Sequence, residues 1–167
     1  YQGYDDLPNL YFYPVPSYGL PMGTLIPEEV GHLLVTEKSI SVSNLANGTT
    51  RLQPVLMQIR QAAGVVAALS VRQNKDVNEV TVRDAQRILL DAKGYLLPYL
   101  DLPVDDKHFK VIQRIGATGI LRGRGVNAGW SNQTWFDTDS LLYTDQLKEG
   151  LHDFYSQFNV NYEGKDI

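Results

Sequence analysis

The chain has 167 residues, of which 43% are hydrophobic and 20% charged, and its net charge is −4 at pH 7. These values are typical of a globular chain with one medium domain or two small ones, and they exclude wholesale disorder. The acidic balance argues against a nucleic-acid partner, because phosphate contacts need clustered Lys and Arg. The sequence contains no cysteine, which excludes disulfides and thiolate chemistry.

Neither a metal site nor a membrane segment is predicted. The histidines, His32, His108 and His152, are widely spaced, and no two of them stand at the spacing of a ligand pair. No apolar run approaches the roughly 20 residues of a membrane span. The chain begins Tyr1-Gln2 without a Met, so we expect it to be part of something longer.

The first part of the chain is predicted to be extended. Residues 1–31 are rich in Tyr, Pro and Gly, and each proline removes a backbone donor and biases its predecessor away from helix. The apolar run 32–36 suits a buried strand, and the polar stretch 39–44 begins with period-two alternation. We therefore expect one or two short strands near 32–43, followed by a turn at Asn47-Gly48.

A long helix is predicted from about Pro54 to Arg72. Proline fits the first turn of a helix, where its missing N–H costs nothing. Ala62, Ala63 and Ala67 lie at helical spacing, and we expect them to be buried against a sheet, because small residues permit close packing. A plain core helix and a helix approached by a flat ligand give the same pattern.

A shift in composition near residue 76 predicts two parts, residues 1–75 and a helical appendage over 76–167. A glycine-rich turn is expected at 119–129 and a frayed tail from Asn159. Three further helices are predicted, at about 81–94, 106–117 and 144–158. The predicted fold class is α+β and mainly helical, with short strands that would complete a sheet in the parent protein, followed by the appendage.

The segment from Ser41 to Gly64 is the one with a chemical interpretation, and it contains the 48–54 segment, Gly-Thr-Thr-Arg-Leu-Gln-Pro. A loop that leads into a helix start offers free N–H groups and the positive end of the helix dipole. Arg51 adds a fixed charge with a planar fork of donors. This combination suits a pyrophosphate or the pyrimidine edge of a reduced flavin, although a junction with no ligand is also compatible with these residues alone.

Six motifs follow one another over residues 18–70. They are Tyr18-Gly19-Leu20-Pro21, Leu25-Ile26-Pro27, Leu33-Leu34-Val35, Ile40-Ser41-Val42-Ser43, the 48–54 segment, and Gln61-Ala62-Ala63-Gly64 with the apolar residues after it. Their order and spacing resemble the C-terminal, flavin-binding end of the FAD-dependent oxidoreductase family. The resemblance implies that the helix start faces the isoalloxazine. It also implies that the positions nearest the flavin are Gly48, Thr49, Arg51, Leu52 and Gln53.

Several features depart from the family pattern. Arg60 and Glu37 stand where glycines are common, and Asn44 stands where many relatives have a histidine. No Gly-x-Gly-x-x-Gly follows a strand, so the element that binds the ADP half of FAD is missing. We therefore expect FAD only in the intact parent, with the missing N-terminal dinucleotide-binding part as the partner of this chain. No catalytic residue is assigned, and the isolated chain is expected to be inactive.

The appendage resembles one S-layer homology repeat over residues 106–147. The resemblance rests on Asp106-Lys107-His108-Phe109, the glycine-rich stretch after Ile115, and Trp135-Phe136-Asp137-Thr138-Asp139. The Thr-Arg-Ala-Glu motif of that family is Thr-Asp-Gln-Leu here, at 144–147. We expect one core between two helices, with Trp135 covering it, formed by Phe109, Ile112, Ile115, Leu147 and Leu151.

Two functions stay open. The first is a fragment of a flavin-dependent oxidoreductase. The second is a non-catalytic module associated with glycan or cell wall, in which Trp130, Trp135 and Tyr143 would meet the sugar. Some bacterial relatives are labelled xanthan lyases, but nothing in these residues supports polysaccharide elimination. The residues do not fix the compartment, although the extracytoplasmic side of a bacterium is the location we favour.

Overall fold

The computed structural model describes residues 17–128 and 131–157 of the chain. Its α-helices are α1 (Asn44–Thr50), α2 (Gln53–Gln73), α3 (Val82–Asp91), α4 (Phe109–Thr118) and α5 (Thr144–Gln157). Short 3₁₀ turns lie at η1 (Met22–Leu25), η2 (Glu37–Ser39) and η3 (Val77–Glu79), and two antiparallel strands form a hairpin, β1 (Arg124–Ala128) and β2 (Ser131–Trp135). The predicted fold class, α+β and mainly helical, is confirmed for this part of the chain.

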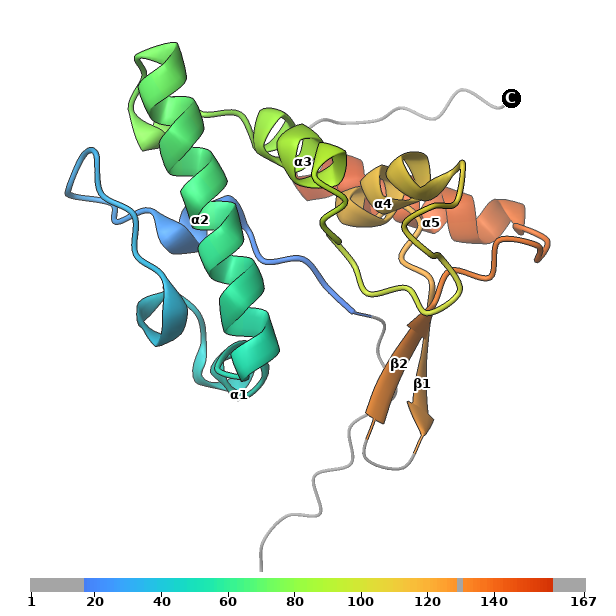
Figure 1. Ribbon diagram of the computed structural model, residues 1–167. Helices are drawn as coiled ribbons and strands as arrows, with labels where there is room; N and C mark the ends of the chain where they lie inside the picture. Colours follow the sequence, from blue (N-terminus) through green and yellow to red (C-terminus); the bar gives the residue numbers. More distant parts are fainter. Residues whose placement is uncertain (1–16, 129–130, 158–167) are drawn as a thin grey trace, which may run out of the picture.

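The elements form two groups joined by α3. Figure 1 shows α1 beside the start of the long helix α2, and α4, α5 and the hairpin on the other side of the molecule, with α3 between the two groups. Three apolar clusters hold this arrangement. One lies between α2 and the segment that precedes it, one between α2 and α3, and one around α4.

The long helix α2 confirms the prediction of a single helix after residue 53. Pro54 lies in its first turn, and Asn74 ends it in the left-handed conformation, with φ of 51°. Its buried side chains follow helical spacing: Leu56, Ile59, Ala63, Val66, Leu69 and Ser70. The predicted burial of the alanines is correct only for Ala63, because Ala67 lies outside this stripe and is exposed, and Ala62 is half-buried.

Helix α2 bears on the expectation that no apolar run approaches the length of a membrane span, which stays a prediction. With 21 residues, it is the one helix in the described ranges that is long and apolar enough to cross a membrane by length and composition. A core helix packed inside a domain passes the same test, so this property is weak support for a span. Two of the three apolar clusters include residues of α2, so packing accounts for the part of its apolar composition that is buried, 33% of the apolar window.

The strands expected near 32–43 do not form in the described structure. Residues 33–36 are without regular secondary structure, and the chain then enters η2. Only isolated backbone bonds support the segment, from the Val35 N–H to the Leu25 carbonyl (2.8 Å) and from the Ser41 N–H to the Thr24 carbonyl (2.9 Å). A ladder needs repeated bonds to a neighbouring strand, and no described segment runs beside this one as a strand.

Helix α3 connects the two groups through its buried side chains. Thr81 caps it as predicted, since its side chain accepts a hydrogen bond from the Asp84 N–H (3.2 Å). Ala85 packs with Val66 of α2, whereas Leu90 belongs to the cluster around α4. Residues on both sides of the predicted boundary at residue 75 therefore belong to one apolar cluster. The division into 1–75 and 76–167 stays a prediction.

The core of the appendage differs in part from the expected one. Phe109 and Ile112 are buried together as predicted, and the other buried members of their cluster are Leu90, Leu97, Tyr99 and Leu102. Leu147 and Leu151 are half-buried and are not members. Helix α5 instead meets the chain just after α4, where a Cβ on Gly150 would lie 2.0 Å from the Ile120 carbonyl oxygen. Helix α4 ends at the C-cap Gly119, whose φ of 78° turns the chain toward the hairpin that precedes α5.

The glycine-rich stretch predicted as a turn contains the hairpin. Strand β1 pairs with β2 from Arg124, opposite Trp135, to Ala128, opposite Ser131. Gly123 precedes it with φ of 77°, and a Cβ there would lie 2.5 Å from the Trp135 carbonyl oxygen, so glycine is required. The tail predicted to fray from Asn159 and residues 1–16 lie outside the described residues.

Candidate functional site

The junction between α1 and α2 carries all five residues predicted to lie near a flavin. Gly48 and Thr49 lie in the last turn of α1, Arg51 ends that helix, and Leu52 and Gln53 begin α2. The expected loop is thus largely helical, which corrects the predicted turn at residues 47–48. The cause is local, since the Ser43 side chain caps α1 by accepting from the Ala46 N–H (3.2 Å). All five residues are exposed.

The start of α2 leaves its backbone donors uncapped. The N-cap residue is Leu52, whose side chain has no acceptor, and no side-chain cap bond is made. The intrahelical pattern begins with the bond from the Leu56 N–H to the Leu52 carbonyl (2.9 Å). The first N–H groups of a helix have no partner within it and point out of its positive end. This end can therefore donate to an electron-rich group.

No acidic side chain of the described residues neutralises the positive end of α2. No acidic residue stands in the first turn of α2. Within the described residues, the Arg51 guanidinium makes no ion pair at 4 Å or less. A guanidinium and a helix start that both lack a counter-charge make this junction a local positive site on an acidic chain.

Tyr18 ties the first sequence motif to this junction. Its hydroxyl lies 2.6 Å from the Thr49 Oγ1, and Thr49 donates its own hydroxyl hydrogen to the Ala46 carbonyl (2.9 Å). Because a threonine hydroxyl has one hydrogen, Tyr18 is the donor in the first contact. Beside it, a Cβ on Gly48 would meet nothing within 4 Å. Packing within this chain therefore leaves the space over Gly48 free for another group.

Two of the departures from the family pattern contact each other. The Arg60 guanidinium forms an ion pair with the Glu37 carboxylate. Glu37 also has φ of 64°, in the left-handed region where glycine is favoured. Sequence reasoning identified both positions as replaced glycines but did not find that they pair. The signal in the sequence that could have indicated this contact is that both residues stand where the family commonly has glycine.

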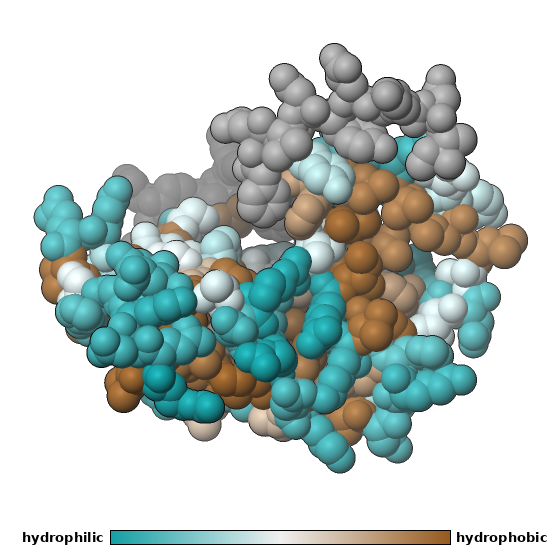
Figure 2. Space-filling view, turned by 90° about the horizontal axis from the view of Figure 1, so that it is seen from above, coloured by the Kyte–Doolittle hydropathy of each residue, from teal (hydrophilic) through white to brown (hydrophobic). Residues whose placement is uncertain are grey.

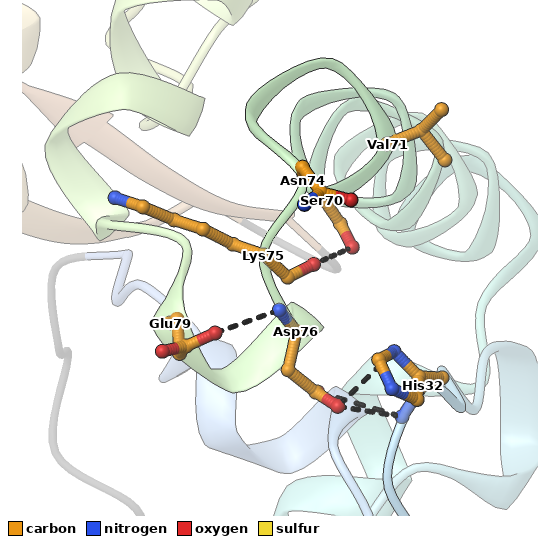
Figure 3. Close-up of a pocket in the computed structure, with 7 residues that line it drawn as sticks. All are labelled: His32, Ser70, Val71, Asn74, Lys75, Asp76 and Glu79. Carbon is orange, nitrogen blue, oxygen red and sulfur yellow. Dashed lines mark hydrogen bonds and ion pairs between the residues drawn. The ribbon is translucent and has the colours of Figure 1, made fainter.

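A polar hollow lies at the opposite end of α2, and Figure 3 shows the residues that line it. Its polar groups bond to one another. Asp76 accepts from the His32 N–H (3.1 Å) and lies 3.1 Å from its Nδ1, and Ser70 donates to the Lys75 carbonyl (2.6 Å). Glu79 in turn accepts from the Asp76 N–H (2.8 Å), which closes a capping box. These bonds explain the cluster as part of the turn that follows α2. Because α2 has 21 residues, this turn lies about 30 Å from the start of the helix.

The groups with shifted pKa values lie in the second half of the chain. The Thr81 hydroxyl lowers the pKa of Asp84, Lys110 that of Asp91, and Arg124 that of Asp137, each chiefly by hydrogen bonding. Burial, followed by the charge of Asp101, raises the pKa of the Tyr99 hydroxyl. A helix cap, exposed ion pairs and a core tyrosine explain these shifts, and none of them defines an acid or base beside the α1–α2 junction.

Two of the three aromatic residues considered for glycan binding lie in the described structure. Trp130 lies outside the described residues, Trp135 is half-buried, and Tyr143 is 66% exposed. Glycan association stays a prediction. At the position where many relatives have a histidine, Asn44 is the exposed first residue of α1. No group of His, Asp or Glu in the described ranges could hold a metal ion.

Comparison with known proteins bears on the α1–α2 half of the chain. A family model for FAD dependent oxidoreductases matches residues 2–89, more than half of the sequence. The match includes the α1–α2 junction and ends within α3. The chain therefore belongs to the FAD dependent oxidoreductase family. Neither the curated proteins nor the solved structures provide a match.

Proposed function

We propose that this chain supplies one wall of the flavin site of an FAD-dependent oxidoreductase, in an intact parent that also contains a dinucleotide-binding part. The observation that carries the proposal is the uncapped, unneutralised start of α2 beside Arg51, within the family match. FAD, when bound, supplies the two-electron redox chemistry. The chain itself would bind and orient the cofactor at this wall.

Each residue of the junction has a distinct part in the proposal. The N–H groups at the start of α2 would donate to oxygen atoms at the pyrimidine edge, and Arg51 would balance negative charge there. Gly48 leaves space for a flat ring to approach, since a Cβ at this position meets nothing in the chain. Tyr18 holds Thr49 and thereby fixes the last turn of α1.

Exposed apolar side chains surround the junction, and they support the proposal that another part of the parent protein covers this surface. Leu45, Leu52 and Met57 are 73%, 54% and 60% exposed, although they flank the site within one or two helical turns. Apolar residues gathered beside a polar site are typical of an interface. We propose that the dinucleotide-binding part of the parent covers them.

The test compares the full-length parent with its Arg51→Ala variant. The full-length protein should carry the absorbance of FAD, and Arg51→Ala should weaken FAD retention by about ten- to a hundredfold, the effect of one charge-assisted hydrogen bond of roughly 1.5–3 kcal/mol. Arg51→Lys, which keeps the charge but not the fork, should lie between the two. Arg72→Ala removes an arginine from the far end of α2 and is the matched control.

The present chain alone should retain no FAD, because the ADP-binding element is missing from it. Full-length protein that stays free of flavin after incubation with excess FAD would contradict the proposal. Equal FAD retention by the Arg51→Ala and Arg72→Ala variants would instead leave a flavoprotein in which Arg51 does not take part.

A further inference from the structure

An open groove between α3 and α4 is lined by three arginines. Arg83 and Arg87 lie one helical turn apart on α3, and Arg114 lies on α4. The other residues that line the groove are Asp84, Gln86, Val111, Ile115 and Thr118. On the face seen from above, Figure 2 shows strongly hydrophilic side chains next to a strip of hydrophobic ones.

The groove carries an excess of positive charge. Arg87 pairs with Asp84 (3.1 Å), the one acidic residue of the lining. Arg83 donates to the neutral amide of Gln86 (2.9 Å) and so keeps its charge, and Arg114 makes no ion pair in the described part of the chain. The lining therefore carries three arginines and one carboxylate, and the Asp91 carboxylate also interacts electrostatically with Arg87 and Arg114. The groove is complementary to carboxylates.

The floor of the groove is apolar. Val111 and Ile115 stand four residues apart on α4, so both lie on the same helix face. Val111 is 65% exposed and Ile115 is half-buried. Apolar side chains of α4 beside arginines from both helices match an amphipathic helix, which places its apolar residues in a groove between helices and its charges along the rim.

We propose that this groove binds an acidic amphipathic helical segment of a partner protein. Apolar side chains of the segment lie on Val111 and Ile115, and its carboxylates meet Arg83, Arg87 and Arg114. Charge complementarity selects this occupant. The groove is short and has only three arginines in its lining. This suits one peptide helix better than the extended phosphate surface of a nucleic acid or a membrane. The proposal is independent of flavin binding.

The test uses the complete chain and a fluorescein-labelled synthetic peptide, with leucines spaced four apart on one helix face and glutamates beside them. Fluorescence anisotropy near physiological salt should show saturable binding. Arg83→Glu and Arg114→Glu should each weaken it at least tenfold, and Val111→Glu likewise. Lys148→Glu makes the same charge reversal at an exposed position of α5 outside the groove and should have little effect. Circular dichroism confirms that each variant is folded.

Three results would overturn the proposal. The first is no saturable binding of the peptide. The second is equal binding by the wild type, Arg83→Glu and Arg114→Glu. The third is a preference for phosphatidylserine vesicles over the peptide, lost in the same variants, which would assign the groove to a lipid surface. A peptide with glutamine in place of glutamate should lose binding, and its retention would count against the charge argument.

Discussion

Glu37 combines two effects that oppose each other at a single residue. Its left-handed backbone, with φ of 64°, is unfavourable for a residue with a side chain by roughly 1–2 kcal/mol. Its ion pair with Arg60 is about half exposed, and exposed pairs contribute about 0–1 kcal/mol. The backbone term is therefore the larger one. The pair offsets only part of the cost of having replaced a glycine.

Glu37→Gly is therefore expected to raise the free energy of unfolding slightly or leave it within about 1 kcal/mol, because glycine removes the backbone strain while the pair is lost. Glu37→Ala keeps the strain, loses the pair, and should be the less stable of the two. Urea denaturation at neutral pH measures both. A glycine variant less stable than the alanine variant would contradict the backbone strain, and a glycine variant clearly less stable than the wild type would show that the ion pair outweighs the backbone term.

Tyr99 makes stability depend on alkaline pH. Burial and the nearby Asp101 raise the pKa of its hydroxyl above the ordinary value of about 10. As pH rises past 10, the unfolded chain loses this proton first and therefore binds fewer protons than the native chain. The contribution of Tyr99 is complete below about pH 10 and falls above it.

Tyr99→Phe should cost about 1 kcal/mol near pH 7, where it removes the hydrogen bond to the Arg122 carbonyl (3.3 Å). Above pH 10 the difference from wild type should shrink, because phenylalanine has no proton to lose. Urea unfolding across pH 7–11 tests this, with Tyr143→Phe as the variant at an exposed position. A difference that grows with pH would contradict the assignment.

At the scale of the helices, two glycines allow the effect of side-chain packing on stability to be distinguished from the effect of helix propensity. Gly116 of α4 lies against the segment between α3 and α4, and a Cβ there would come within 2.2 Å of the Tyr99 hydroxyl and 2.7 Å of Leu97 Cδ1. Gly64 of α2 faces open space, where a Cβ meets nothing within 4 Å. Gly116→Ala should therefore destabilise the chain by about 1–3 kcal/mol through overpacking. Gly64→Ala should stabilise it by about 0.5–1 kcal/mol through helix propensity. Thermal unfolding followed by circular dichroism distinguishes them, and shifts of the same sign would contradict the packing argument.

The elements that could be predicted are those specified by their own residues. Apolar spacing and Pro54 predicted α2, and Thr81 predicted the start of α3. Pairing between strands depends on a distant partner. The apolar run at 32–36 therefore predicts a strand that does not form. The polar, glycine-rich sequence after Gly123 predicts a turn, although it forms a hairpin.

The same distinction applies to the candidate site. Motif order indicated five neighbouring residues, and the structure places them together at one helix junction because they are contiguous. The contacts of Tyr18 with Thr49 and of Glu37 with Arg60 join residues 31 and 23 positions apart. No local pattern encodes such contacts, so they could be found only in the folded chain.

At the scale of the whole molecule, α3 determines where the chain can be divided. Val66 and Leu69 of α2 are 1% and 4% exposed, and they share a cluster with Val80 and Ala85. A chain that ends at residue 75 would uncover them and should lose cooperative unfolding, whereas a chain that ends at Gly94, after α3, keeps this cluster whole, uncovers only Leu90 of the next one, and should unfold more cooperatively. Thermal unfolding and dye binding to exposed apolar surface test both chains. Equal cooperativity would support a domain boundary at residue 75.

The uncapped start of α2 has a consequence for engineering this protein. An Asp, Ser or Thr at position 52 would cap the helix, and such caps contribute about 0.5–2 kcal/mol. A library screened for heat tolerance alone should therefore enrich these residues in place of Leu52. A screen that also demands cofactor retention should reject Asp, because its negative charge would repel the negative charge of the cofactor that Arg51 is proposed to balance. Comparing the two selections would show whether the leucine is kept at the expense of stability because the open helix end is useful.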